Sequence, residues 1–130
     1  MSVFTKAIKI YNDYGYGIRT GLNPYHFNNN GSLSYPFTCV YHYNSSNILD
    51  TGGGISPIEA YFLETLAESY NPKNIFIVGN AFGWSTIIMA LLWPKAKIVA
   101  IDSGIEGIDN FAWIELTNKI ASVNILICIV

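Results

Sequence analysis

The chain has 130 residues, a net charge of −2 and an apolar share of 51%, enough to bury the core of one domain but not of two. Its seven basic residues form no cluster, which argues against nucleic-acid binding. Charged residues make up only 12%, about half of the usual share, so we expect a partner chain or a second copy to cover part of the surface.

Targeting and metal-binding signals are missing from the sequence. The N-terminus lacks the continuous apolar stretch of a signal peptide, and the most apolar run, residues 87–93, is too short to cross a bilayer. We therefore expect a cytoplasmic chain without membrane contact. Cys39 and Cys128 are then reduced thiols, the latter an inert one within a strand. His26 and His42 have no ligand at a metal-binding spacing, so no metal is expected.

Residues 1–54 form an N-terminal extension rich in Tyr, Asn and Gly. The pattern predicts a short helix over residues 4–12, irregular chain after it, a turn at residues 28–31 and a strand over residues 37–43. The many tyrosines are expected to pack and cover the surface, and a substrate-pocket lining is the alternative. His42 is interpreted as a strand histidine with a structural hydrogen bond rather than as a base.

Residues 55–130 are more regular, and a helix opens them. Ser56 is the expected N-cap, followed by Pro57 at the first helical position and by Glu59 at the capping-box position. The helix is expected to end near Ser69, ahead of Pro72. Apolar residues at helical spacing mark its expected buried face. These residues are Ile58, Tyr61, Phe62, Leu63 and Leu66.

Alternating strands and helices follow. Residues 74–79 predict a strand buried on both faces, residues 84–93 a covered helix, and residues 97–101 a second strand. A helix over residues 110–121 and a strand over residues 124–130 complete the pattern. This order predicts βαβ units with parallel strands, and hence an α/β, partial Rossmann-like three-layer sandwich. Because such sheets usually continue, we expect a truncated domain, or one that a partner chain completes.

The segment with features of a ligand-binding site runs from the first of these strands to Asp102. A turn with Gly79 and Gly83 joins that strand to a helix. A ligand can approach the backbone closely there, because glycines lack Cβ atoms and the first N–H groups of a helix are unpaired. Asp102 ends the next strand, 23 residues after Gly79, where a carboxylate accepts hydrogen bonds from ribose hydroxyls. The alternative for Asp102 is a solvated strand-end charge or a cap. Ala81 replaces the middle glycine of the dinucleotide pattern, which disfavours a nicotinamide-dependent oxidoreductase.

The same residues resemble a known family. Gly-Asn-Ala-Phe-Gly-Trp-Ser-Thr at residues 79–86 is similar to motif I of class I S-adenosylmethionine (SAM)-dependent methyltransferases, in the form found in small-molecule O-methyltransferases. Residues 55–63, 89–94 and 98–102 resemble the helix before that motif, the helix end after it and the second strand with its acidic tip. The resemblance implies a Rossmann-like fold, SAM as cofactor, and methyl transfer to a small-molecule acceptor, most simply an oxygen.

The resemblance also implies roles for individual residues. The turn at residues 79–83 would support the methionine and ribose portions of SAM, and Asp102 would bind the ribose hydroxyls. Ser85 would contact the methionine carboxylate or stabilise the turn, Ser103 would lie beside adenine, and Ser56 would approach the methionine end. The nine expected cofactor-binding residues are Gly79, Asn80, Ala81, Phe82, Gly83, Ser85, Asp102, Ser103 and Ser56.

Two features depart from the family pattern. Ile77 stands where the family commonly has an acidic residue, two positions before the first glycine. The sequence also ends before the region in which metal-dependent members carry their carboxylate ligands and base, so no catalytic residue can be assigned. The alternative function is therefore a non-catalytic, Rossmann-like interaction subunit.

Overall fold

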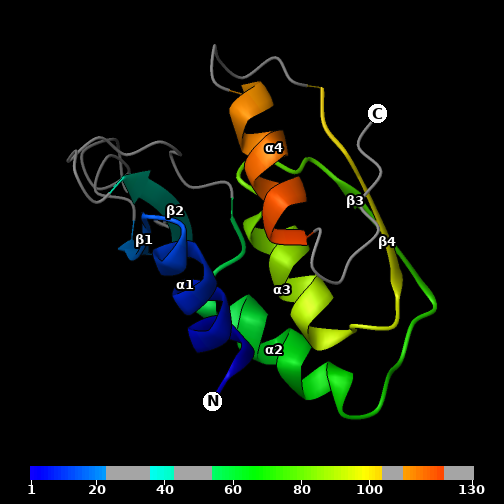
Figure 1. The fold of residues 1–130 in the computed structure, drawn as a ribbon. Coiled ribbons are helices and arrows are strands. Elements are labelled where there is room, and N and C mark those ends of the chain that lie inside the picture. Colours follow the sequence, from blue (N-terminus) through cyan, green and yellow to red (C-terminus); the bar gives the residue numbers. More distant parts are fainter. Residues whose placement is uncertain (23–35, 43–53, 104–109, 122–130) are drawn as a thin grey trace, which may run out of the picture.

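The computed structural model describes residues 1–22, 36–42, 54–103 and 110–121. Within these ranges the protein is a mixed α/β structure with four helices and two small sheets, one of which is parallel (Figure 1). The expected turn at residues 28–31 and the expected strand over residues 124–130 lie outside the described ranges. None of the described helices is long and apolar enough to span a membrane.

The first helix, α1 (Val3–Asp13), confirms the expected N-terminal helix. Ser2 caps it by accepting a hydrogen bond from the Thr5 amide, and one face of the helix is buried. The side chains of that face follow the helical repeat and point into the core. They are Val3, Ala7 and Tyr11.

Two antiparallel strands follow, β1 (Tyr16–Leu22) and β2 (Pro36–His42). The expected strand over residues 37–43 is confirmed by β2, but the expectation of irregular chain after α1 is wrong because β1 is a strand. Gly17 lies opposite Tyr41 in the register, and the Tyr41 ring fills the space that a side chain at Gly17 would need. Glycine is therefore required at position 17 because the Tyr41 ring packs across the neighbouring strand. Strand propensities alone do not reveal this requirement.

The helix α2 (Pro57–Ala67) begins as the sequence indicates. The Ser56 hydroxyl accepts from the Glu59 amide at 3.3 Å, and the Glu59 carboxylate accepts from the Ser56 amide at 2.7 Å, which completes the capping box. Glu64 accepts a hydrogen bond from the Val3 amide at 2.9 Å. That bond joins α2 to the start of α1.

The expected buried face of α2 is wrong for three of its residues. Ile58, Tyr61 and Phe62 are 70%, 72% and 64% exposed. The helix instead buries Ala60, and it contacts α1 and α3. Because a small residue lies at this contact, the helices approach through Ala60 and the large apolar side chains point outward.

The parallel sheet consists of β3 (Asn74–Val78) and β4 (Lys97–Ile101), connected through α3 (Trp84–Leu92). The last helix, α4 (Asn110–Ala121), packs against α3, and both helices lie on the same side of the sheet (Figure 1). Sheet residues that face them are covered, with Ile98 and Ala100 fully buried. On the other face Phe76 is 64% and Val78 76% exposed. The expectation that β3 is buried on both faces is therefore wrong.

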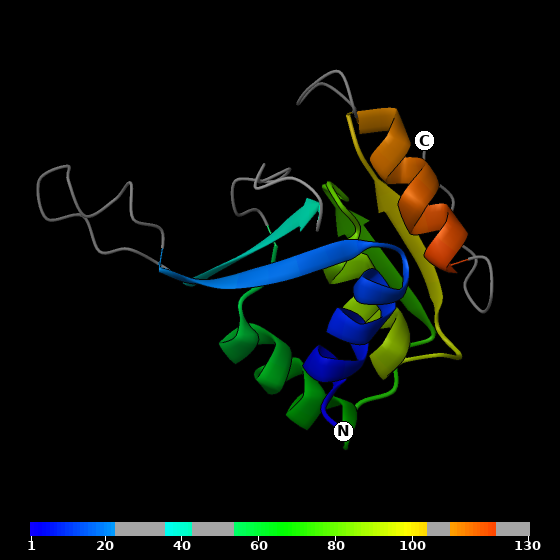
Figure 2. The same cartoon turned by 60° about the vertical axis from the view of Figure 1, so that its left-hand side comes forward.

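One hydrophobic core joins the N-terminal elements to the helices that follow. Trp84 of α3 stacks edge-to-face on Phe4 at 5.3 Å between ring centroids and lies 5.6 Å from the Tyr11 ring. Figure 2 shows α1 lying in front of α3, between β1 and α2. The helix α3 is covered as expected, since its residues Trp84, Ile87 and Ile88 are all buried.

Candidate functional site

The turn between β3 and α3 has an unusual backbone. Gly79, Ala81 and Gly83 all have positive φ, at 83°, 42° and 75°. A side chain at Gly79 would meet no atom within 4 Å, so this part of the turn faces open space. The Gly83 amide donates to the Asn80 carbonyl at 2.7 Å and closes the turn. The two glycines thus supply conformations that other residues adopt only at a cost.

Asp102 holds this turn directly. Its Oδ2 atom accepts hydrogen bonds from the Asn80 amide at 2.6 Å and from the Ala81 amide at 2.7 Å. The Gly79 amide donates to the Ile101 carbonyl at 2.8 Å, which continues the hydrogen bonding between β3 and β4 to the carboxyl ends of the strands. The glycine turn and the acidic strand tip therefore lie together at the carboxyl ends of two parallel strands, where α/β proteins commonly bind ligands.

Asp102 has a structural role in this arrangement. The amides of Asn80 and Ala81, which the sequence suggested would face a ligand, donate to the Asp102 carboxylate instead. The interpretation of Asp102 as a local cap accounts for these bonds without a ligand. A carboxylate can accept about four hydrogen bonds, so the two amide bonds do not by themselves exclude contact with a sugar.

The Asn80 side chain is committed to a buried polar network. Its Nδ2 group donates to the Ala81 carbonyl and to Thr117 Oγ1, each at 3.1 Å, and its Oδ1 atom accepts from the Thr86 hydroxyl at 2.8 Å. All three side chains are buried. The network connects the turn to α3 and α4, and burial makes each bond costly to lose. The sequence did not single out Thr86 or Thr117. A hydroxyl among the apolar residues of α3 was the only signal for Thr86, and α4, which also contains Glu115 and Lys119, offered none for Thr117.

Phe82 and Gly83 also serve the interior. Phe82 is buried in the core, and its carbonyl accepts a hydrogen bond from the Tyr11 hydroxyl at 2.7 Å. A side chain added at Gly83 would collide with Thr117. Both residues therefore support the turn from the core side, and the Tyr11 hydrogen bond connects α1 to it.

The three expected serines occupy different surroundings. Ser56 is buried and its hydroxyl caps α2. Ser85 is half-buried at the start of α3, and Ser103 is exposed just after β4. Ser85 and Ser103 are thus the hydroxyls among the expected residues that lie closest to solvent.

The turn borders a small cavity of about 30 Å³. It holds about one or two water molecules, whereas sites for cofactors and drug-sized ligands usually measure about 300–1,000 Å³. Beside the turn, the described residues thus enclose too little space for a nucleoside. The residues that line the cavity are Gly54, Gly79, Asn80, Ala81, Phe82, Trp84 and Ser85.

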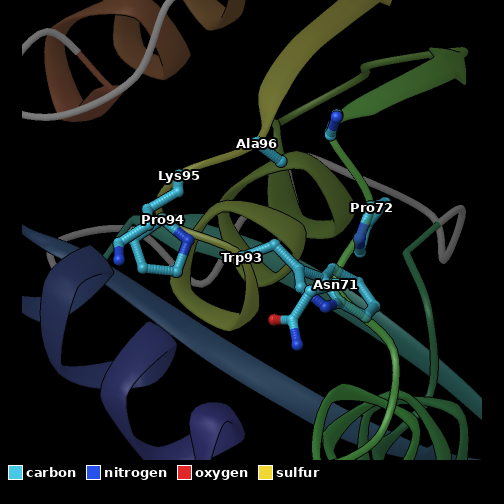
Figure 3. Close-up of a pocket in the computed structure, with 7 residues that line it drawn as sticks. Asn71, Pro72, Trp93, Pro94, Lys95 and Ala96 are labelled. Carbon is cyan, nitrogen blue, oxygen red and sulfur yellow. The ribbon is translucent and has the colours of Figure 1, made fainter.

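A larger hollow of about 540 Å³ lies elsewhere (Figure 3). It is formed by the connections that lead into β3 and β4, so it lies at the amino ends of the strands. The turn and Asp102 lie at the opposite ends. The hollow is lined by Asn71, Pro72, Lys73, Trp93, Pro94, Lys95 and Ala96.

Metal-ligand clusters are absent from the described ranges, where no group of three or more His, Cys, Asp or Glu side chains gathers. Cys39 is buried in β2. His26, Cys128 and the side chain of His42 lie outside what the structure describes. The comparisons add no family assignment: no protein-family model matches the chain, and no curated protein matches it significantly.

Proposed function

We propose that the chain is a SAM-dependent methyltransferase, or the cofactor-binding part of one, with a Rossmann-like architecture. The observation that supports this proposal is the position of Asp102, which lies directly against the glycine turn at the carboxyl ends of β3 and β4. To bind an adenosyl group in this way, a site needs a carboxylate at a strand end and a glycine backbone about one ribose apart. Here they are joined by hydrogen bonds of 2.6 and 2.7 Å.

Several residues suit the cofactor. The open side of Gly79 admits the tail of a nucleoside close to the backbone, and Asp102 is placed to accept from a ribose hydroxyl beside the turn. Ser85 offers a hydroxyl at the start of α3, where the helix dipole favours a carboxylate. Bound SAM would supply an electrophilic methyl group to a small-molecule oxygen. Asn80, Phe82 and Gly83 hold the turn in shape, Ser56 caps α2, and no residue is assigned as a base.

Calorimetric titration with SAM and with S-adenosylhomocysteine tests the proposal. We expect saturable binding that Asp102→Asn weakens at least tenfold, because the ribose contact loses its charge. Asp13→Asn is the matched control, since Asp13 is an exposed acid on α1, and it should leave the affinity unchanged. Circular dichroism of each variant shows whether the fold is retained. Absence of heat with millimolar SAM and folded wild-type protein would refute the proposal, and displacement by NAD would favour an oxidoreductase.

A second candidate function is that of an interaction subunit. Exposed Phe76 and Val78 on the uncovered face of β3 favour it, because large apolar groups on one sheet face usually meet a partner. This candidate needs no cofactor, so the titration above separates it from the first.

A further inference from the structure

We infer that β3 is the pairing strand of a symmetric dimer, in which two copies of this chain join antiparallel through β3 and form one continuous sheet. This inference is independent of the proposed cofactor. It rests on the backbone of β3, on its side chains and on the charges at the ends of the sheet.

The backbone of β3 has one paired and one open side. The Lys73 carbonyl accepts from the Lys97 amide at 2.9 Å, and the Gly79 amide donates to the Ile101 carbonyl at 2.8 Å. Alternate residues of a strand direct their N–H and C=O groups to the same side. Residues 75 and 77 therefore also face β4, and residues 74, 76 and 78 face outward. In the part of the chain that the structure describes, no strand pairs with this outer edge.

Side chains of β3 continue the argument. Phe76 and Val78 lie on the sheet face that α3 and α4 leave uncovered, and both are mostly exposed. A short parallel pair with one open apolar face is an uncommon arrangement, because parallel strands are normally buried on both faces. An unpaired apolar edge strand attracts another strand, so this edge is suited to pairing.

A second copy fits the edge because β3 is self-complementary. A two-fold axis through Phe76 pairs Phe76 with its own copy and Asn74 with Val78 of the partner. These are the residues whose backbone groups face outward, and each such pair exchanges two hydrogen bonds. The same axis closes the assembly at two chains, whereas a head-to-tail contact would propagate.

Charges favour the antiparallel orientation. Lys73 and Lys97 lie at the amino end of the sheet and Asp102 at the carboxyl end. The axis through Phe76 places Lys73 opposite Gly79 of the second copy, next to the turn that carries the Asp102 carboxylate. Within the described ranges Lys73 forms no ion pair. Antiparallel pairing thus separates the like charges and brings unlike charges closer.

The contact is small. A five-residue strand with two exposed apolar side chains lies below the area of a standard stable interface. We therefore expect a reversible dimer with a dissociation constant on the order of 10–100 μM.

Light scattering or sedimentation from 5 μM to 1 mM tests the inference. The wild-type mass should rise from one chain to two chains across this range. Phe76→Lys should weaken the dimer at least tenfold, because like charges meet across the axis. Tyr61→Lys is the matched control: it removes a similarly exposed aromatic from α2, away from the strand, and should leave the dimer unchanged.

A further pair of variants separates loss of pairing from loss of apolar surface. Phe76→Ala and Phe76→Pro both remove the ring, but only proline also removes the outward N–H, and it leaves the bonds to β4 in place, as proline can on an edge strand. Phe76→Pro should weaken the dimer at least tenfold relative to Phe76→Ala, while circular dichroism stays unchanged. A monomer at 1 mM, or a dimer that persists in folded Phe76→Lys and Phe76→Pro, would overturn the inference.

Discussion

Removal of the Asp102 carboxylate should loosen the turn even without a ligand. Asp102→Ala deletes the acceptor of two short backbone hydrogen bonds, from the amides of Asn80 and Ala81. A hydrogen bond to a charged group contributes about 1.5–3 kcal/mol. Because Asp102 is only partly buried and both bonds share one oxygen, we expect a combined loss of about 2–3 kcal/mol. Asp102→Asn retains one acceptor oxygen and should lose about half as much.

Urea unfolding followed by circular dichroism measures this effect. With a urea slope of about 2 kcal/mol per molar, the midpoint of Asp102→Ala should fall by about 1–1.5 M, and Asp102→Asn should lie between it and the wild type. Asp13→Ala is the control, because Asp13 forms only an exposed ion pair with Lys9, and it should cost less than about 0.5 kcal/mol. If Asp102→Ala unfolds at the same midpoint as this control, the carboxylate does not hold the turn.

Two further predictions concern the backbone of the turn. Gly83→Ala should lower the free energy of unfolding by about 3 kcal/mol, because it combines a positive φ of 75° with a collision at Thr117. Gly15→Ala is the control: its φ is similar but the space around it is open, so it should lower the free energy by only about 1 kcal/mol. Equal melting temperatures of the two variants would contradict this account. Ala81→Gly should raise the free energy of unfolding by about 0.5 kcal/mol, because relief of the positive φ at Ala81 slightly outweighs the added freedom of the unfolded chain. A lower melting temperature for Ala81→Gly would show that its φ carries no strain.

Local signals in the sequence predicted most of the secondary structure. The cap formed by Ser56 and Glu59, the apolar run of β3 and the largely apolar helix α3 each depend on neighbouring residues only, and all three occur in the structure. The strand β1 was missed because its glycines lower strand propensity, and its partner lies about twenty residues away in the register. Pairing at that distance is not encoded in a local pattern.

Burial was harder to predict than secondary structure. The spacing of Ile58, Tyr61 and Phe62 marks an apolar stripe, but the spacing cannot say which side of α2 meets its neighbours. The small Ala60 made the contact instead. In the same way, the apolar run of β3 could not reveal that α3 and α4 cover the same face of the parallel sheet and leave the other face exposed.

The sequence predicted that the glycine turn and Asp102 lie side by side, but not how the turn is bonded internally. The spacing of Gly79 and Asp102 correctly placed them at adjacent strand ends. The roles of Asn80, Thr86 and Thr117 depend on how α4 packs over the turn, and the connection to α4 carries no motif. Buried hydroxyl partners of this kind become evident only in three dimensions.

The carbonyl of Ile55 accepts hydrogen bonds from both the Thr38 hydroxyl at 2.7 Å and the Trp84 indole at 3.0 Å. A shortened protein that starts at residue 54 would therefore lose one of these donors, together with the rings of Phe4 and Tyr11 that cover Trp84. Its indole would face water, and a tryptophan side chain stripped of its aromatic neighbours promotes self-association during expression. Recombinant work on the glycine turn thus needs the first forty residues, although none of them belongs to the motif.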